Sequence, residues 1–422
     1  MSSIHEDSSA ATAALHSQAF SPEEIAQLRS QTPGCEGRIH LNNAGAGLMS
    51  QPVLDTVREH LELEARVGGY EAADLRRREL DQAYEAVARL LGTRRRNVAM
   101  VENTTAGFAL ALSAFDFQPG DVILLSRDDY TSNQIQFLSL GQRLGVRMVR
   151  IPDAPEGGLD PAAAGRLMEE HRPRLVTVSH VPTQSGLVQP VEELGRRCRE
   201  HGVPLLVDAC QSIGQLPVDV EALGCDFLCA STRKFLRGPR GMGFLYVSDR
   251  ALEAGRAPLY PDLHGAQWTR EDGLQLASDA RRFENWEFSY ALILGTGVAA
   301  AQAVELGLER LAARIGGLAE GLRQRLQELD LEGQSNGKGL RVLDRGPRLC
   351  GIVTVELPGQ NPGIVEELRR QGLNTSASLA SSARLDFQDK GVEWALRLSP
   401  HAYNTEDELD RAVEILARAL RS

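Results

Sequence analysis

Two residues that each follow an apolar run carry the clearest chemical signal in the sequence, Asp208 and Lys234. A carboxylate at the end of a buried strand is costly unless a cation pairs with it, and a protonated pyridine nitrogen is such a cation. A lysine among apolar residues tends toward its neutral amine, which can form a Schiff base. Alone, Asp208 could cap a helix and Lys234 could be a surface lysine. Together they indicate a cofactor that carries both an aldehyde and a pyridine ring.

Two further segments that follow strand-like runs complete this signal. Glu102–Gly107 opens a predicted helix, whose free N–H groups could take a phosphate together with the hydroxyls of Thr104 and Thr105. Simple threonine capping is the alternative for this segment. Asp128–Asn133 places Tyr130 where its ring could stack on a flat ligand. An aldehyde, a pyridine ring and a phosphate together describe pyridoxal 5′-phosphate (PLP), which we therefore expect as the cofactor.

The elements that must position these residues can be read from the alternation of apolar runs. Strands are expected at residues 97–101, 122–125, 146–149, 175–178, 204–207, 227–230 and 243–247, with helical patterns between them. The last strand could return antiparallel. Near-continuous apolar strands separated by helices predict an α/β fold with a mostly parallel sheet covered on both faces. In such sheets ligands bind beyond the carboxyl ends of the strands, so the candidate residues should meet there.

The length of 422 residues predicts a large domain and a smaller one. A long amphipathic helix is expected from Ala291 to about Leu329, followed by strands near 351–356 and 395–398 and a final helix from Asp407. We expect a disordered polar lead-in over residues 1–20 and an N-terminal segment over 21–60 that joins the small domain and the active site. The large cofactor-binding domain should span 61–300 and the small α+β C-terminal domain 301–422.

Composition narrows the range of partners. A net charge of −11 argues against a nucleic acid or an anionic membrane as partner, and no apolar run approaches the ~20 residues of a membrane helix. The first twenty residues lack the features of a secretory signal. The arginine triplets at 76–78 and 94–96 are interpreted as solvated surface. Six dispersed cysteines without a completing histidine or second cysteine pair indicate buried free thiols in a reducing cytoplasm and no metal site.

The segment from Asp208 to Val247, DACQSIGQLPVDVEALGCDFLCASTRKFLRGPRGMGFLYV, resembles the core of the class V aminotransferase and cysteine desulfurase superfamily, the fold type I PLP enzymes. The resemblance spans roughly Leu41 to Leu420 and includes the segments 41–45, 181–186 and 397–405. It implies the fold of that superfamily, a sheet between layers of helices with a smaller C-terminal domain. It also implies a cytoplasmic homodimer with active sites at the interface and a small amino-acid substrate.

The resemblance implies a role for each matching residue. Lys234 would bind the cofactor covalently and transfer protons, Asp208 would pair with the pyridine nitrogen, and Gln211 would reach the ring hydroxyl. The residues implied around the rest of the cofactor are Tyr130 and Thr183 against the ring, and Thr104, Thr105, Ser231 and Arg233 on the phosphate.

Two residues are implied on the substrate side, Asn43 in the entry segment and Arg397 near the end of the chain. Arg397 matches an arginine that clamps the amino-acid carboxylate, a task that suits a bidentate guanidinium. An interdomain salt bridge is the alternative for this arginine.

Two departures from the superfamily pattern narrow the expected function. Desulfurases carry a mobile loop with a cysteine that accepts sulfur, but the corresponding stretch here, residues 373–382, has neither cysteine nor arginine. Arg233 stands where desulfurases usually have histidine. With the closing motif 400–405 and the stretch 283–287, this resembles the branch of hercynylcysteine sulfoxide lyases of ergothioneine biosynthesis, with isopenicillin N epimerase-like proteins nearby. Where relatives reach the partner subunit's phosphate with a hydroxyl, this chain has Trp286.

The expected reaction is therefore β-elimination from an S-substituted cysteine or its sulfoxide, with Lys234 as the base and pyruvate, ammonia and a sulfur compound as products. An epimerase or racemase needs the same proton abstraction without a leaving group. A class V aminotransferase is a further alternative. A PLP-binding module without turnover is the remote one, because mere binding does not require the aspartate on the pyridine nitrogen.

Overall fold

The computed structural model describes residues 19–332 and 340–421, and its largest sheet has seven strands in the order β2-β8-β7-β6-β5-β3-β4. These strands are β2 (Val98–Val101), β3 (Val122–Leu125), β4 (Arg147–Arg150), β5 (Leu175–Ser179), β6 (Leu205–Asp208), β7 (Phe227–Ser231) and β8 (Gly243–Val247). Neighbours from β7 to β4 are parallel, whereas β8 runs antiparallel to both β2 and β7. The predicted mostly parallel sheet with an antiparallel return at 243–247 is confirmed.

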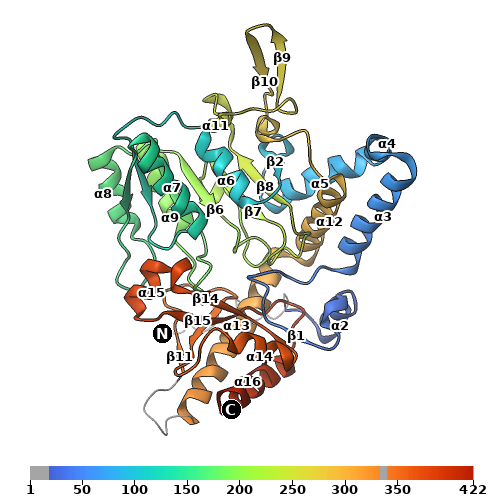
Figure 1. Ribbon diagram of the computed structural model, residues 1–422, viewed down its shortest axis with the longest axis vertical. Helices are drawn as coiled ribbons and strands as arrows, with labels where there is room; N and C mark the ends of the chain where they lie inside the picture. Colours follow the sequence, from blue (N-terminus) through green and yellow to red (C-terminus); the bar gives the residue numbers. More distant parts are fainter. Residues whose placement is uncertain (1–18, 333–339, 422) are drawn as a thin grey trace, which may run out of the picture.

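Alternate residues of each strand build two cores on opposite faces of this sheet. On β2, Val98 and Met100 belong to one core, and Ala99 and Val101 to the other. One face packs against α6 (Thr104–Ser113) and α7 (Thr131–Leu144). The helices of the other core are α5 (Arg77–Leu90), α8 (Pro161–His171), α9 (Val191–His201) and α12 (Tyr290–Leu306). Figure 1 shows the sheet between these layers. Burial on both faces explains the continuous apolar runs of the strands.

The single long helix expected from 291 to 329 is wrong, because the structure has two helices there. α12 ends at Leu306 and α13 (Leu308–Glu332) follows at a bend of 83°. Gly307 between them has a φ of +87°, in the left-handed region that glycine adopts without a steric penalty. α12 packs on α5 and on α3 (Gln51–Val67), whereas α13 packs on α16 (Glu406–Arg421). Gly307 thus marks the passage from the large domain to the small one.

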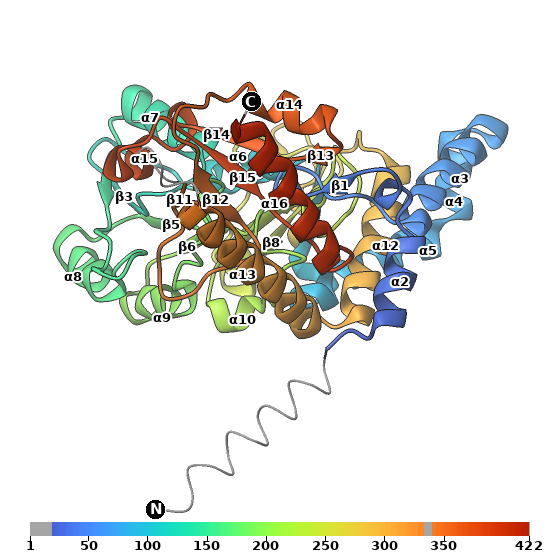
Figure 2. The ribbon, with the colours of Figure 1, turned by 90° about the horizontal axis from the view of Figure 1, so that it is seen from below.

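The small domain is built on a second sheet of four antiparallel strands, β11-β12-β15-β14. Its strands are β11 (Arg341–Val342), β12 (Val353–Glu356), β14 (Ser376–Leu379) and β15 (Trp394–Leu398), and its further helices are α14 (Ile364–Arg370) and α15 (Arg384–Lys390). Seen from below, α13 and α16 lie side by side across this sheet (Figure 2). This arrangement confirms the predicted smaller α+β C-terminal domain.

The N-terminal segment connects both domains. β1 (Ile39–His40) pairs in parallel with β13 (Leu373–Asn374) of the small domain, whereas α3 packs on α12 of the large domain. α2 (Pro22–Ser30) precedes β1, and its Ser21 cap forms a reciprocal capping box with Glu24. Most of the lead-in predicted over 1–20 lies outside the described residues. Phe20, however, is buried with the guanidinium of Arg310 over its ring.

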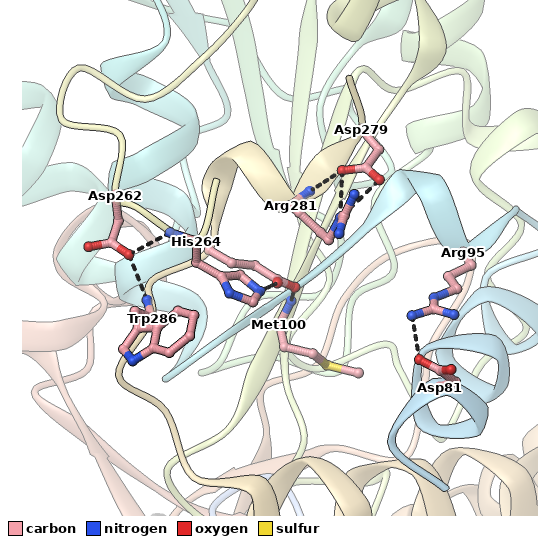
Figure 3. Close-up of polar contacts among 9 residues, drawn as sticks. Asp81, Arg95, Met100, Asp262, His264, Asp279, Arg281 and Trp286 are labelled. Carbon is pink, nitrogen blue, oxygen red and sulfur yellow. Dashed lines mark hydrogen bonds and ion pairs between the residues drawn. The ribbon is translucent and has the colours of Figure 1, made fainter. Parts of the chain in front are cut away.

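The remaining elements lie outside the two main sheets. They are the helices α4 (Gly69–Leu75), α10 (Val220–Leu223) and α11 (Asp249–Glu253) and the hairpin of β9 (Ala266–Arg270) and β10 (Gly273–Leu276), which projects from the body of the molecule (Figure 1). The two arginine triplets form ion pairs at the surface, as predicted for solvated residues. Arg95 pairs with Asp81 at 2.6 Å, a contact visible in Figure 3.

The described residues were expected to hold neither a membrane span nor a metal site. No single helix in residues 19–332 and 340–421 has the length and apolar composition to cross a membrane; by these two criteria alone, the bent pair α12 and α13 could do so together. Within the same ranges, no group of three or more His, Cys, Asp or Glu side chains could hold a metal ion.

Candidate active site

A cavity of about 300 Å³ lies beyond the carboxyl ends of β5, β6 and β7. All nine residues predicted to hold the cofactor line it: Thr104, Thr105, Tyr130, Thr183, Asp208, Gln211, Ser231, Arg233 and Lys234. These residues come from five separate segments of the chain. The parallel sheet brings the segments together, because the carboxyl ends of its strands share one edge.

Lys234 follows β7, and its side chain is buried in the cavity wall. Burial lowers the pKa of this amine, while Cys210 and Asp208 act in the opposite direction. Within the described part of the chain, its Nζ makes no hydrogen bond or ion pair, and it lies 6.0 Å from the centre of the Tyr130 ring. A buried amine without a partner, shifted toward its neutral form, is suited to attack a carbonyl group.

Asp208 ends β6 and is 3% exposed. Its Oδ2 accepts a hydrogen bond of 3.0 Å from the Asn133 side chain, and its Oδ1 accepts one of 3.0 Å from the Cys210 backbone N–H. No helix begins at this aspartate, so the alternative of an N-cap is excluded. The carboxylate is instead held by two donors at the cavity wall, facing the space that Lys234 also lines.

The first turn of α6 forms one end of the cavity. Asn103 caps this helix by accepting from the Ala106 N–H at 3.0 Å, so neither threonine serves as the cap. The Thr104 N–H donates to Ser231 Oγ at 3.1 Å, which ties the helix start to the end of β7. Free N–H groups and hydroxyls at a helix N-terminus are suited to bind a phosphate.

Arg397 lies buried on β15 of the small domain and contacts Thr183, a lining residue, but is itself absent from the residues that line the cavity. Its Nη1 donates to the backbone oxygen of Thr183 at 3.0 Å, and its Nε is buried without a hydrogen-bond partner. Burial and the charge of Arg233 lower its pKa to about 10. Among residues 19–332 and 340–421 no carboxylate lies within ion-pair distance of it, so the alternative of an interdomain salt bridge is excluded.

Asn43, the other residue predicted on the substrate side, is also absent from the cavity lining. Its side chain is fully buried, its Nδ2 donates to the Ser399 carbonyl at 2.8 Å, and its Oδ1 accepts from the Tyr403 hydroxyl at 2.5 Å. These bonds join the N-terminal segment to the loop after β15. The amide thus belongs to a joint within the protein, and it is absent from the residues that line the cavity.

Four cavity or supporting residues were missed in the sequence. Asn133 is a polar side chain on the buried side of the first turn of α7, and Ser179 is the last residue of β5, where its Oγ accepts from the Tyr130 N–H at 3.0 Å. Cys210 lines the cavity with its Sγ 2.7 Å from Thr104 Oγ1, which corrects the expectation that the thiols are all buried in the core. Arg240 lines it from the glycine-rich turn. The strand-end rule could have found Ser179 and Cys210.

Trp286 lies outside the cavity lining. Its backbone N–H donates to Asp262 at 2.7 Å, and its ring lies against His264 and Tyr70, with centroids 6.0 and 6.5 Å away. Figure 3 shows Asp262 between the backbones of His264 and Trp286. The tryptophan thus contributes to an aromatic surface cluster and provides no hydroxyl toward the cofactor site.

The residues of the cavity fit PLP in chemistry and in placement. The Lys234 amine and the Asp208 carboxylate line one space, as the aldehyde and the pyridine nitrogen of the cofactor require. The buried Oε1 of Gln211 has no partner, while its Nε2 donates to the Ala44 carbonyl at 3.1 Å. An unpaired buried oxygen is costly unless a ligand satisfies it.

Comparison with known proteins agrees with this site. The family model "Aminotransferase class-V" matches residues 39–412. A probable cysteine desulfurase of Methanothermobacter thermautotrophicus is 28% identical over 92% of this chain and 96% of its own, and a probable hercynylcysteine sulfoxide lyase of Mycobacterium tuberculosis is 28% identical over 93% and 92%. An isopenicillin N epimerase of Amycolatopsis lactamdurans is 31% identical over 89% and 94%.

The fold has a close counterpart among solved structures. The apo cysteine desulfurase of Thermococcus onnurineus NA1 superposes with a TM-score of 0.83 and 24% identity, covering 96% of this chain and 99% of that one. The architecture predicted from the sequence is therefore confirmed. With the family match over most of the chain and the lysine–aspartate cavity in place, the chain belongs to the class V aminotransferase family and is a PLP-dependent enzyme.

Proposed function

We propose that this enzyme is a carbon–sulfur lyase that cleaves an S-substituted cysteine, such as a cysteine sulfoxide conjugate, to pyruvate, ammonia and a sulfur product. The observation that carries the proposal is a buried Lys234 amine, unpaired among the described residues, that lines one cavity with Asp208, while the segment 373–382 has no cysteine. The hercynylcysteine sulfoxide lyase among the relatives supports the same reaction class.

The cofactor, when bound, supplies an electron sink for a carbanion at Cα of the substrate. Asp208 would keep the pyridine nitrogen protonated, and Asn133 would hold that carboxylate in place. Lys234 would remove the Cα proton, a general-base contribution of roughly 10²–10⁴-fold. Arg397 would bind the substrate carboxylate through the guanidinium atoms that its bond to Thr183 leaves unused.

The cysteines of the chain argue against a persulfide relay. Five of the six, Cys35, Cys198, Cys225, Cys229 and Cys350, have thiol pKa values raised by burial. Cys210 lines the cavity, but it follows a strand of the large sheet and its Sγ is held by Thr104 Oγ1 at 2.7 Å and the Ser231 N–H at 3.3 Å. Residues 373–382, which correspond to the mobile cysteine loop of desulfurases, form β13, β14 and a short turn. Thr131 fastens the end of this segment by donating to the Ser382 carbonyl at 2.7 Å. The sulfur of the substrate would therefore leave as part of the product.

A homodimer in the cytoplasm remains part of the proposal. Large apolar side chains are exposed on α4 and on the segment around β9, namely Tyr70, Leu75, Leu259, Tyr260, Leu263, Trp268 and Leu274. Such a concentration of exposed apolar surface favours contact with a second copy. Sedimentation of the purified protein at several concentrations tests it, and a monomer throughout would contradict it.

The test of the lyase is pyruvate release from a panel of cysteine S-conjugates and their sulfoxides, measured with the wild-type enzyme and Lys234→Ala. Pyruvate from the wild type alone is expected. If saturating conjugates and sulfoxides give none, the lyase assignment is wrong.

An epimerase is the second candidate, because the isopenicillin N epimerase relative also matches most of this chain, 89% of it. It needs the same proton abstraction by Lys234 and no leaving group. Exchange of the Cα proton with solvent deuterium, without pyruvate, would favour this activity. A half-reaction that leaves the aminated cofactor would instead indicate an aminotransferase.

A further inference from the structure

Arg240 lines the cavity beside the start of α6, together with Asn103 and Gly241. In the described part of the chain its guanidinium makes no hydrogen bond or ion pair. Most arginines near this domain boundary are engaged: Arg237, for example, donates to the Leu48 carbonyl at 2.7 Å and to Thr32 Oγ1 at 2.5 Å. Arg240 is exposed, so its guanidinium is open both to solvent and to a ligand in the cavity.

The turn that carries Arg240 is rigid. Thr232 fastens it by donating from its hydroxyl to the Pro239 carbonyl at 2.7 Å and from its backbone to the Met242 carbonyl at 3.1 Å. Gly241 has a φ of +90°, which a side chain at this position would disfavour. Because Thr232 lies between Ser231 and Arg233, the same short segment positions the turn and two of the expected phosphate ligands.

The turn is also held against the helix that would bind the phosphate. A Cβ added at Gly243 would lie 3.1 Å from the backbone carbon of Asn103, so the absence of a side chain lets β8 approach the cap of α6. The backbone that carries Arg240 is thereby held near the first turn of α6, where the Thr105 N–H makes no hydrogen bond in the described structure and the helix dipole favours an anion.

Two arginines and one glutamate line this end of the cavity, Arg233, Arg240 and Glu102. Burial and the neighbouring charge of Arg240 both lower the pKa of Arg233. The Oε1 of Glu102 accepts from the Asn285 side chain at 3.1 Å. Neither guanidinium forms an ion pair with a carboxylate in the described part of the chain, and two neighbouring cations of this kind are stabilised by a bound anion.

We propose that Arg240 is a ligand of the cofactor phosphate, and that Arg233 and Arg240 together supply the charge that a dianionic phosphate requires. The helix N-terminus and Ser231 provide directed hydrogen bonds, and the two guanidiniums provide the countercharge. One protomer thus contributes both kinds of contact to the phosphate.

The test compares PLP with pyridoxal, which has the same ring and aldehyde without the phosphate. The cofactor is removed from the full-length enzyme, and each compound is titrated back by the absorbance of its adduct with Lys234. Wild type, Arg240→Gln, Arg240→Lys and the control Arg411→Gln are compared. Arg411 is exposed on α16 and makes no polar contact within the described ranges.

Arg240→Gln is expected to weaken PLP binding about tenfold, the size of a charge-assisted hydrogen bond, and to leave pyridoxal binding within about twofold. The PLP affinity of Arg240→Lys should lie between those of the wild type and Arg240→Gln, and the affinity of Arg411→Gln should match that of the wild type. Inorganic phosphate should compete with PLP less effectively in Arg240→Gln. Added salt should weaken PLP binding more in the wild type than in this variant.

Three outcomes would overturn the proposal. Equal losses for PLP and pyridoxal would show that the substitution disturbs the turn or the ring site. Unchanged PLP affinity with a raised KM for substrate would place the substrate's anion, and not the phosphate, against Arg240. Unchanged affinity and KM would show a solvated arginine at the rim.

Discussion

The two domains contribute to the active site in different ways. The large domain provides Lys234 and Asp208 directly from the ends of β7 and β6, where the sheet fixes the backbone on both sides. The small domain would provide Arg397, whose link to the large domain at this point is one hydrogen bond to the Thr183 carbonyl. In the proposed mechanism, proton transfer therefore depends on one sheet, whereas recognition of the substrate carboxylate depends on how the two domains meet.

The joint between the domains is built from buried polar groups. His401 stacks between Phe235 and Tyr403, with ring centroids 6.1 and 5.0 Å away, and its Nε2 lies 2.9 Å from the Phe235 carbonyl. Burial lowers its pKa to about 3, so this histidine stays neutral over the physiological range. The position of Arg397 should therefore not depend on the protonation of His401.

The largest effect on kcat is expected at Lys234, which follows a strand of the large sheet. Lys234→Ala should lower kcat by about 10³-fold, because it removes the proposed base. Single-turnover release of pyruvate measures this loss. Its melting temperature should change little, since the lysine makes no polar contact in the described structure that folding would lose. A variant that retains near wild-type turnover would refute the role of Lys234.

Substitution of Asp208 should lower kcat more than substitution of Asn133, which only holds the Asp208 carboxylate. Asp208→Asn should lower kcat by roughly 10²- to 10³-fold, because a buried charge opposite the ring nitrogen is lost. Asn133→Ala should cost about tenfold, since it removes one hydrogen bond to that charge while the Cys210 N–H remains. Steady-state kinetics measure both losses. Equal losses would show that Asn133 does more than orient the carboxylate.

Substitution of Arg397, at the boundary between the domains, should change KM more than kcat. Arg397→Gln should raise KM by about 10- to 100-fold with a smaller change in kcat, because the charge-assisted contact to the substrate carboxylate is lost. The control is an amino-alcohol analogue without the carboxylate, whose weak binding should not change further. A fall in kcat alone would place Arg397 in the chemical step and would remove the contrast between the two domains.

The buried carboxyl group of Asp129 in the large domain predicts that the stability of the protein depends on pH. Burial, with Asp208 adding to it, raises the pKa of Asp129 to about 7, against about 3.9 in an unfolded chain. The folded state therefore holds an extra proton between these values, so stability should fall as pH rises from about 4 to about 7 and then level off.

The Asp129→Asn variant of the cofactor-free protein should be more stable than the wild type at pH 8, by an amount on the order of a few kcal/mol, and equal to it near pH 4. Urea unfolding across this range measures the difference. The exposed Asp272→Asn variant is the matched control and should follow the wild type. A constant difference at every pH would show that Asp129 does not titrate as expected.

The smallest effect on KM is expected at Asn43, which joins the N-terminal segment to the loop after β15. Asn43→Ala should lower the melting temperature by several degrees, because the Tyr403 hydroxyl and the Ser399 carbonyl lose their partner. KM should rise less than in Arg397→Gln. Calorimetry and kinetics on the same samples separate these effects. A large rise in KM without loss of stability would support the direct substrate contact that the sequence predicts for Asn43.

The sequence by itself determined the strands of the large sheet and the residues that follow them, because continuous burial on both faces leaves a strong local pattern. The positions after these strands also indicated Asp208, Lys234, Thr104, Thr105 and Tyr130, whereas Thr183, Gln211, Ser231 and Arg233 were expected from the family resemblance. The tertiary structure alone decided the break at Gly307, the bond of Asn133 to Asp208, and the enclosure of Asn43 between Ser399 and Tyr403. Each of these depends on contacts between segments far apart in the chain, and an isolated glycine or asparagine carries no local signal of its distant partner.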